Sequence, residues 1–445
     1  MSLAKNAAGG MATGGAVFAL GIIVSVVLTR SLGPEARGVY YLLVTTNLLL
    51  ATLVEFGVGA ALSTFVARGR FGLGELNSAA VLVAAAAGVV AFAAATIAFP
   101  FLRGGVFRNL PYSYVVVALV LVALVVYQSY WNAMMIGAGR IALLNKANLA
   151  LNVLNALLIV LLVGVFEFGI PGFLASWAIS MFIGAVGEFA LLDRLYSTAW
   201  RPKRATLAAL LGFGVRAQGR GIGQQLFLRF DMYALNALVG TRSVGVYSLS
   251  TSLAERLWMP AAAITAASAG KIAELPREES ARLTARVTRA SILIMIALAA
   301  PFAVASPWLI PFMYGQRFSA AVLPLVILLA GTLCFAANAV VETFLVGQLQ
   351  RPGLVSLLSG LEFAISIGLY TGLILWHGIV GAAIASTVTY ALALALTLAV
   401  FTRESALSMR EILVPSADDF RQYLRVLSAA AGRIGVVGRP SRQEW

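Results

Sequence analysis

The chain has 445 residues, of which 60% are hydrophobic and 11% are charged, and its formal net charge is +14. A soluble fold of this size could not bury so much apolar surface, so the composition excludes an ordinary water-soluble protein and favours a bilayer as the solvent. Apolar runs of about 20 residues, the length that crosses a hydrocarbon core of about 30 Å, recur along the sequence.

These runs predict twelve transmembrane helices in two sets of six. The first set covers residues 11–29, 40–66, 78–102, 113–137, 147–166 and 170–192. The second set covers residues 209–239, 243–270, 290–314, 320–347, 354–375 and 379–402. The span 209–239 is the least regular, because it is long and contains several charges. The predicted fold class is therefore an all-α integral membrane protein.

The distribution of basic residues predicts the orientation. With the N-terminus placed inside, 22 of the 32 lysines and arginines fall in inside segments, six in outer loops and four within spans. Basic residues in short loops are retained on the cytoplasmic side, so both termini are expected in the cytoplasm. The positive charge then reflects topology and contact with anionic membrane lipids, and nucleic-acid binding is not expected.

Three motifs occur twice in the same order. LGPEARGVYYL at 32–42 returns as VGTRSVGVYSL at 239–249, MMIGAGR at 134–140 corresponds to FLVGQLQR at 344–351, and GIPG at 169–172 corresponds to GIVG at 378–381. In the first pair, Gly33, Gly38, Val39, Tyr40 and Leu42 match Gly240, Gly245, Val246, Tyr247 and Leu249 at an offset of 207. A nearly constant offset indicates an internal repeat.

The repeat predicts the domain organisation. Each copy has an even number of spans, so both copies enter from the same side and are related by a pseudo-twofold axis along the membrane normal. The expected parts are a first lobe (1–195), a basic cytoplasmic linker (196–208), a second lobe (209–403) and a cytoplasmic tail (404–445). The tail is expected to contain a short amphipathic helix over 414–434, capped by Ser416.

Longer stretches around these motifs resemble a known family. LTRSLGPEARGVYYLL near the start, RFDMYALNALVGTRSVGVYSLSTSLA at 229–254 and PFMYGQRFSAAVLPLVILLAG at 311–331 resemble elements of the polysaccharide transporters. These are the oligosaccharide flippases of Wzx type in the multidrug/oligosaccharidyl-lipid/polysaccharide (MOP) exporter superfamily. The resemblance implies two six-helix bundles, a central cationic cavity and movement of an undecaprenyl-diphosphate-linked oligosaccharide from the inner to the outer leaflet. Related lipid II flippases usually have fourteen spans, so the twelve found here argue against peptidoglycan precursor as the cargo.

Charged residues within the spans are the candidates for function, because a charge at membrane depth costs about 3 kcal/mol on insertion scales and usually faces a cavity or a partner. They are Glu55, Glu188, Arg216, Arg220, Arg229, Asp231, Glu255, Arg256, Glu342 and Glu362. Guanidinium groups recognise a diphosphate through paired charge-assisted hydrogen bonds. The four arginines are therefore the predicted substrate-binding residues.

The seventh span leaves two interpretations open. A continuous helix would place two polar stripes on roughly opposite sides, one with Arg216, Arg220, Gln224 and Asp231 and the other with Gln218, Gln225, Arg229 and Asn236. One stripe could line the cavity while the other packs on a neighbouring helix, and the sequence does not say which. Alternatively, Arg216 and Arg220 anchor the chain at the cytoplasmic headgroups, and the span begins near residue 221.

The acids have similar alternatives. Asp231 and Glu255 are candidates for charge pairing or for binding a coupling ion, proton or sodium. Glu55, Glu342 and Glu362 lie alone in apolar stretches, where a proton carrier and a plain helix–helix hydrogen bond are both possible. Glu188 lies near the cytoplasmic end of its span and is expected to contact lipid headgroups.

The remaining chemistry is sparse. His377 is the sole histidine and is expected at an outer surface, and Cys334 is the sole cysteine. No metal-ligand cluster, no Cys/His catalytic pair and no P-loop is present in the sequence, so no metal, cofactor or catalytic residue is predicted, and the chain is not expected to be an enzyme. Pro260, Pro301 and Pro324 are expected to kink their helices.

The preferred function is a flippase that works by alternating access, with lipid-linked oligosaccharide, membrane lipids and polysaccharide-assembly proteins as partners. A cation-coupled drug or metabolite antiporter of the same superfamily is the nearest alternative. A membrane-bound glycan polymerase or ligase, which commonly has a large outer loop, is another. A scaffold without transport activity is the third.

Overall fold

The computed structural model describes residues 3–196, 202–217 and 219–414, without the side chains of residues 3–13, 217 and 219–224. All regular elements in these residues are helices. The longer ones are α1 (Leu3–Val54), α3 (Leu73–Leu102), α5 (Val122–Gly137), α6 (Ile141–Ile159), α7 (Gly169–Tyr196), α9 (Gly219–Leu238), α10 (Thr241–Glu274), α11 (Arg277–Tyr314), α12 (Val322–Thr343) and α13 (Pro352–Ser405). The shorter ones are α2 (Val58–Ala67), α4 (Tyr112–Val120), α8 (Arg204–Ala217), α14 (Met409–Leu413), the 3-10 turn η2 (Gln316–Ala321) and the π-helical turns η1 (Val160–Val165) and η3 (Phe344–Gln348).

The membrane assignment is confirmed. Eight helical stretches in the described part of the chain are long and apolar enough to cross a membrane, which makes this a multi-pass membrane protein. Two of the eight contain a sharp turn and so include two arms each. The predicted count of twelve spans depends on α9 and α10, which are less apolar, and it remains a prediction. His377 is exposed, as expected.

The two long helices α1 and α13 are helical hairpins. Gly33 (φ 71°) interrupts α1 and Gly378 (φ 55°) interrupts α13, both in the left-handed region that glycine adopts without strain. Across the first turn, Arg37 donates a hydrogen bond to Thr29. Across the second, the hydroxyls of Tyr370 and Ser386 lie 2.9 Å apart. A straight helix would separate that second pair by about 24 Å, so the chain must turn back.

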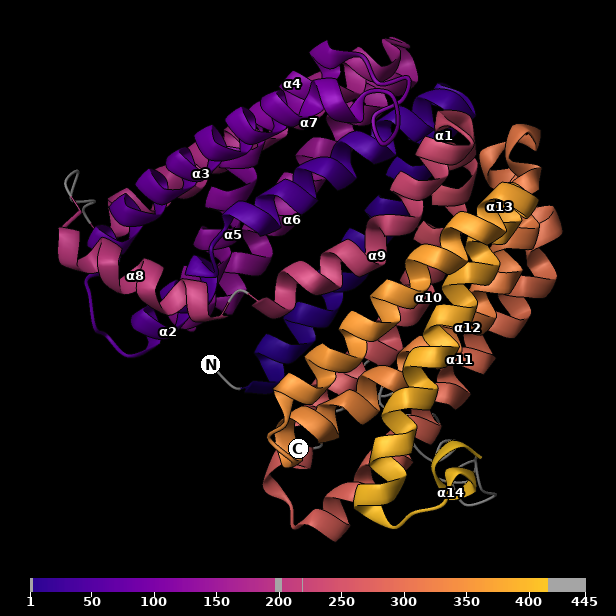
Figure 1. The fold of residues 1–445 in the computed structure, drawn as a ribbon. Helices are drawn as coiled ribbons and strands as arrows, with labels where there is room; N and C mark the ends of the chain where they lie inside the picture. The colour runs from indigo at the N-terminus through magenta and orange to yellow at the C-terminus, as the bar shows by residue number, and fades with distance from the viewer. Residues whose placement is uncertain (1–2, 197–201, 218, 415–445) are drawn as a thin grey trace, which may run out of the picture. The chain divides into compact units, whose positions relative to one another are not determined.

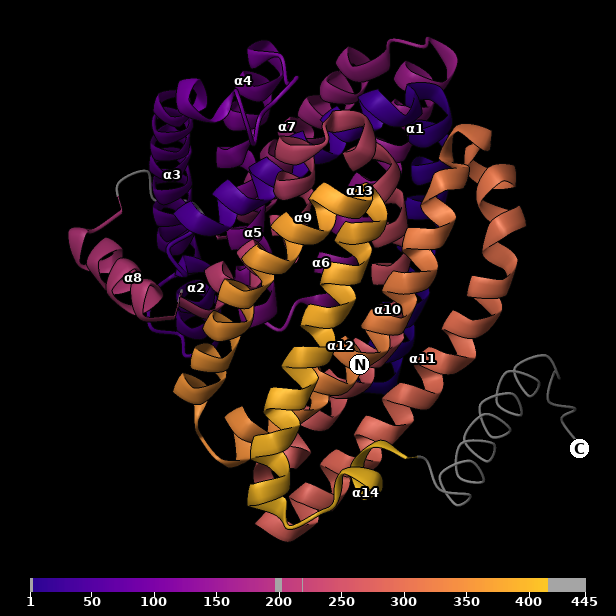
Figure 2. The same ribbon diagram turned by 45° about the vertical axis from the view of Figure 1, so that its right-hand side comes forward.

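Contacts divide the chain into two compact units (Figures 1 and 2). The first consists of Met1–Leu249, Leu309–Ala321 and Thr371–Ala382, and the second of Ser250–Trp308, Val322–Tyr370 and Ala383–Trp445. The unit boundary after residue 249 does not coincide with the predicted linker at 196–208. The two lobes, which the sequence repeat defines, therefore remain a prediction.

Each unit has its own packed interior. In the first, α3, α5, α6 and α7 run side by side (Figure 1), and Tyr130 and Trp131 of α5 are fully buried in an apolar cluster. In the second, the rings of Phe344 and Phe401 meet edge to face with centroids 4.8 Å apart. Aromatic side chains thus fill the centre of both units, where they bury the most apolar area per residue.

The seventh predicted span is described as two helical segments, α8 and α9, on either side of residue 218, which lies outside the described residues. α8 packs against α2 and α3. That the span is a single element therefore stays a prediction. The predicted tail helix over 414–434, with its cap Ser416, lies outside the described residues; just before it, Ser408 and Glu411 form a capping box for α14.

The two copies of the repeated turn pack against each other within the first unit. A methyl group at Gly38 would overlap the backbone carbonyl of Thr241, and one at Gly245 would overlap that of Pro34. Thr241 is the equivalent of Pro34 at the repeat offset of 207, so exchanging the copies converts one contact into the other. This reciprocity is the property of a two-fold contact.

We expect Gly38→Ala and Gly245→Ala each to destabilise the protein by about 1–3 kcal/mol, the usual cost of overfilling a packed contact. Thermal unfolding of purified protein in detergent measures the change. Gly270→Ala is the matched control, since Gly270 lies in α10 and an added methyl group would meet no atom within 4 Å. A melting temperature for Gly38→Ala equal to that of the wild type would contradict the contact.

Candidate functional site

The predicted arginines differ in exposure. Arg216 lies on α8 and is exposed, whereas Arg229 lies on α9 and is half-buried. Residue 218, between α8 and α9, lies outside the described residues, so the shared sector of Arg216 and Asp231 stays a prediction. Arg220 is in α9, but its side chain lies outside the described residues.

Arg229 is fixed by α1, against which α9 packs. Its guanidinium donates a hydrogen bond of 2.9 Å to the Tyr41 hydroxyl and lies 6.0 Å from the centre of the Tyr41 ring. One turn further along α9, the Tyr233 hydroxyl lies 3.0 Å from that of Thr46, also on α1. These contacts hold the guanidinium in one orientation. Neither Tyr41 nor Thr46 could be singled out from the sequence, because their role depends on the pairing of α1 with α9.

The other charged candidates on α9 and α10 belong to different units. Asp231 of α9 is buried in the first unit, and its carboxylate accepts a hydrogen bond of 2.7 Å from the backbone N–H of Met232. Glu255 and Arg256 are half-buried on α10, in the second unit.

Glu55 lies at a break in the membrane helix. α1 ends at Val54 and α2 begins at Val58, and between them Phe56 adopts a φ of 51°. Glu55 accepts a hydrogen bond of 3.2 Å from the Ser129 hydroxyl, and its backbone carbonyl accepts one of 2.8 Å from Tyr130. In a bilayer, irregular backbone is tolerated where protein groups satisfy it. Glu55 is therefore not the isolated acid that the sequence suggests.

Glu342 and Glu362, which the sequence presents as isolated, lie within electrostatic range of each other in the second unit. Glu362 is buried. Asn338 donates a hydrogen bond of 2.9 Å to Glu342 and accepts one of 2.6 Å from Thr397. Three helical arms, from α12 and the two halves of α13, thus contribute to one buried polar cluster. The negative charge of Glu342 disfavours ionisation of Glu362, so proton uptake is favoured there.

Glu188 departs from its predicted position at the headgroups. It is only 4% exposed, because it lies on a buried face of α7 within the first unit, where α7 packs against α5. The position of Glu188 near the end of α7 does not indicate which face of the helix carries it.

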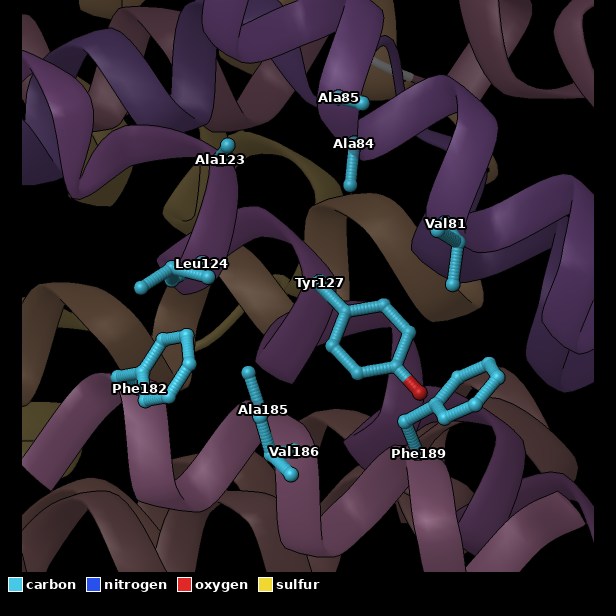
Figure 3. A pocket seen from close by; sticks show the side chains of 10 residues that line it. All are labelled: Val81, Ala84, Ala85, Ala123, Leu124, Tyr127, Phe182, Ala185, Val186 and Phe189. Atoms are coloured by element: carbon cyan, nitrogen blue, oxygen red, sulfur yellow. The ribbon is translucent and has the colours of Figure 1, made fainter.

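An apolar cavity of about 260 Å³ lies between α3, α5 and α7 (Figure 3). Its walls include Phe182 and Phe189, and the Tyr127 ring projects between them and α3. The Tyr127 hydroxyl is bound to Asn77 at 2.9 Å. No charged side chain lines this cavity, so it does not suit a diphosphate or a sugar.

Polar groups paired between helices inside a multi-pass, all-helical membrane protein are typical of the class of membrane transporters. A family model described as "Polysaccharide biosynthesis protein" matches residues 3–269. The chain belongs to this family. No curated protein gives a significant match.

Solved structures with the same fold belong to the MOP superfamily. An inward-facing multidrug resistance transporter of the MATE family is 18% identical with a TM-score of 0.70, the match covering 87% of this chain and 94% of that one. The lipid II flippase MurJ in an inward closed conformation is 13% identical with a TM-score of 0.68, covering 89% and 90%. A MOP superfamily transporter from Pyrococcus furiosus is 16% identical with a TM-score of 0.62, covering 89% and 94%. The predicted fold is confirmed.

We expect Asn338→Ala to destabilise the protein by about 2–3 kcal/mol, since it removes one partner from Thr397 and one from Glu342 in a buried site. Thermal unfolding in detergent again gives the measurement. Asn152→Ala is the control, because Asn152 is exposed on α6 and bonds only to the carbonyl of Asn148 in its own helix. Equal effects of the two substitutions would contradict a structural role for the cluster.

Proposed function

We propose that the protein moves an undecaprenyl-diphosphate-linked oligosaccharide, the repeat unit of a polysaccharide or surface glycan, from the inner to the outer leaflet of the cytoplasmic membrane by alternating access of its two lobes. Membership in the polysaccharide biosynthesis family and a MOP fold shared with a lipid flippase support a cargo that joins a lipid to a glycan. Both termini are proposed to lie in the cytoplasm, where polysaccharide-assembly proteins would meet the tail.

The observation that carries this proposal is the half-buried guanidinium of Arg229 within α9. A charge at this depth is costly, and such residues mark substrate or ion pathways. A guanidinium has five N–H donors in a planar fork that matches phosphate oxygens. Tyr41 orients this fork through its hydrogen bond and its ring. Arg229, together with Arg256 and Arg220, is therefore our proposed ligand for the diphosphate.

Arg216 is assigned the other role. It is exposed in the last turn of α8. A cationic side chain at such a position anchors a helix among anionic headgroups. We therefore propose that Arg216 fixes the position of α8 at the membrane surface and does not bind the cargo.

A cation-coupled antiporter is the second candidate, and the Glu342–Glu362 cluster favours it. Paired acids at membrane depth are a means of binding a proton or a cation. The same cluster would serve a flippase driven by an ion gradient, and Asp231, Glu255 and Glu55 remain candidates for coupling. The cargo therefore distinguishes the two functions, whereas the presence of coupling does not.

Reconstitution of the purified protein tests the proposal. Proteoliposomes carrying a fluorescent polyprenyl-diphosphate oligosaccharide should transfer it between leaflets when an ion gradient is imposed, as measured by quenching of the outer-leaflet label. Arg229→Ala should slow this transfer at least about tenfold, because the cost of losing a buried phosphate contact is about 2 kcal/mol or more. Arg229→Lys should retain part of the rate, since it keeps the charge but loses the fork.

Arg216→Ala is the matched control and should transfer the glycan at the wild-type rate. No transfer by the wild-type protein under any gradient, combined with efflux of a cationic dye, would favour the antiporter. A wild-type rate for Arg229→Ala would remove Arg229 from the site.

A further inference from the structure

The helices α5 and α7 meet in the first unit through polar side chains. A methyl group at Gly184 of α7 would overlap the amide nitrogen of Gln128 on α5, so Gly184 leaves the space that the Gln128 side chain occupies. α6 returns between the two helices, so α5 and α7 run in the same direction. Residues one turn beyond Gly184 on α7 are therefore level with residues one turn beyond Gln128 on α5.

Glu188 is the residue one turn beyond Gly184. It is 4% exposed, and its Oε2 atom has no hydrogen-bond partner among the described residues. α7 packs against α1, α3, α4, α5, α6 and η1. The Tyr127 phenol of α5 lies within electrostatic range of Glu188. No described lysine, arginine or histidine neutralises the carboxyl.

Three buried polar atoms of α5 have no hydrogen-bond partner among the described residues. They are the amide nitrogen of Gln128, the indole nitrogen of Trp131 and the amide oxygen of Asn132. Trp131 and Asn132 are one turn beyond Gln128 and are therefore level with Glu188. Two donors can stabilise a carboxylate, and one acceptor can receive the proton of a carboxylic acid. Both states of Glu188 thus have suitable neighbours, either directly or through one water molecule.

A lone carboxyl in this setting suits a proton better than a metal ion. Burial disfavours an unpaired carboxylate, so taking up a proton is the simplest way to neutralise it. No group of three or more His, Cys, Asp or Glu side chains in the described residues could hold a metal ion. Tyr127 is already engaged as a donor to Asn77 and does not compete for the site.

We propose that Glu188, with Gln128, Trp131 and Asn132, forms a proton-binding site between α5 and α7, in which the carboxyl takes up and releases a proton. As a coupling site it rests on the transport function proposed above. As a proton-binding site it does not, because protonation requires no cargo.

Infrared difference spectroscopy during a pH titration of the purified protein tests the site directly. The wild type should show a C=O band of a protonated carboxylic acid that disappears on deprotonation. Glu188→Gln should lack this change. Glu167→Gln is the matched control, since Glu167 is exposed in the loop before α7, and it should retain the change in full.

Gln128→Leu leaves Glu188 in place and replaces an amide donor by an apolar side chain of similar volume. It should preserve the C=O band at a shifted frequency. If Glu188→Gln does not fold, Glu188→Asp should likewise keep the band with a shifted frequency. A band that persists unchanged in Glu188→Gln, or a wild-type carboxyl that shows no change across the pH range in which the protein is folded, would overturn the site. Because these spectra are recorded without cargo, a failed flipping assay would leave the proton site standing, and a missing band would leave the flippase standing.

Discussion

The reciprocal contact between the two copies of the repeated turn is the constraint on which the first unit depends. Gly38 and Gly245 let two backbones approach without side chains between them, and close approach of this kind stabilises helix pairs where no hydrophobic effect acts between helices. The contact joins the turn of the α1 hairpin to the start of α10. A duplicated turn sequence is therefore explained by its own packing, since each copy is the other's partner.

Neighbouring contacts extend this constraint along the chain. Arg30 donates a hydrogen bond to the carbonyl of Phe312 in the last turn of α11, where a positive charge is favourable. Asn236 of α9 donates to the carbonyl of Val106 at 2.9 Å, and Thr241 bonds to Asn236 at 3.0 Å. Arg30, which the sequence predicts only as an outer-loop charge, thus has a structural role. The second-repeat elements α9 and the start of α10 belong to the first unit because of such contacts.

The two repeats differ in their membrane helices, and the differences concern charged residues. The first copy breaks between Val54 and Val58 and places Glu55 at the break, whereas the equivalent part of α10 is a continuous helix containing Pro260. The first unit holds the buried acids Glu188 and Asp231, while in the second Glu362 is buried within electrostatic range of Glu342. A repeated scaffold whose two copies carry different acidic residues suits a transporter whose halves bind different ligands.

The sequence predicted those features that depend on local chemistry. Apolar runs gave the membrane helices, and the glycine at position 33 marked a turn because its backbone conformation is needed there. It could not predict the burial of Glu188 or the approach of Glu342 to Glu362. These depend on the rotation of each helix about its axis and on which neighbour it packs against.

Cross-linking of the two repeated turns tests the account most directly. Glu35 and Arg242 are exposed and directly follow Pro34 and Thr241, the residues that meet the opposite glycines. Cysteines at these two positions, in a Cys334→Ser background with a protease site inserted between α7 and α8, should be joined by a short bismaleimide. The account predicts that the two halves of the chain then stay together after cleavage. Separation of the halves to the same extent as in a variant with only one of the two cysteines would contradict it.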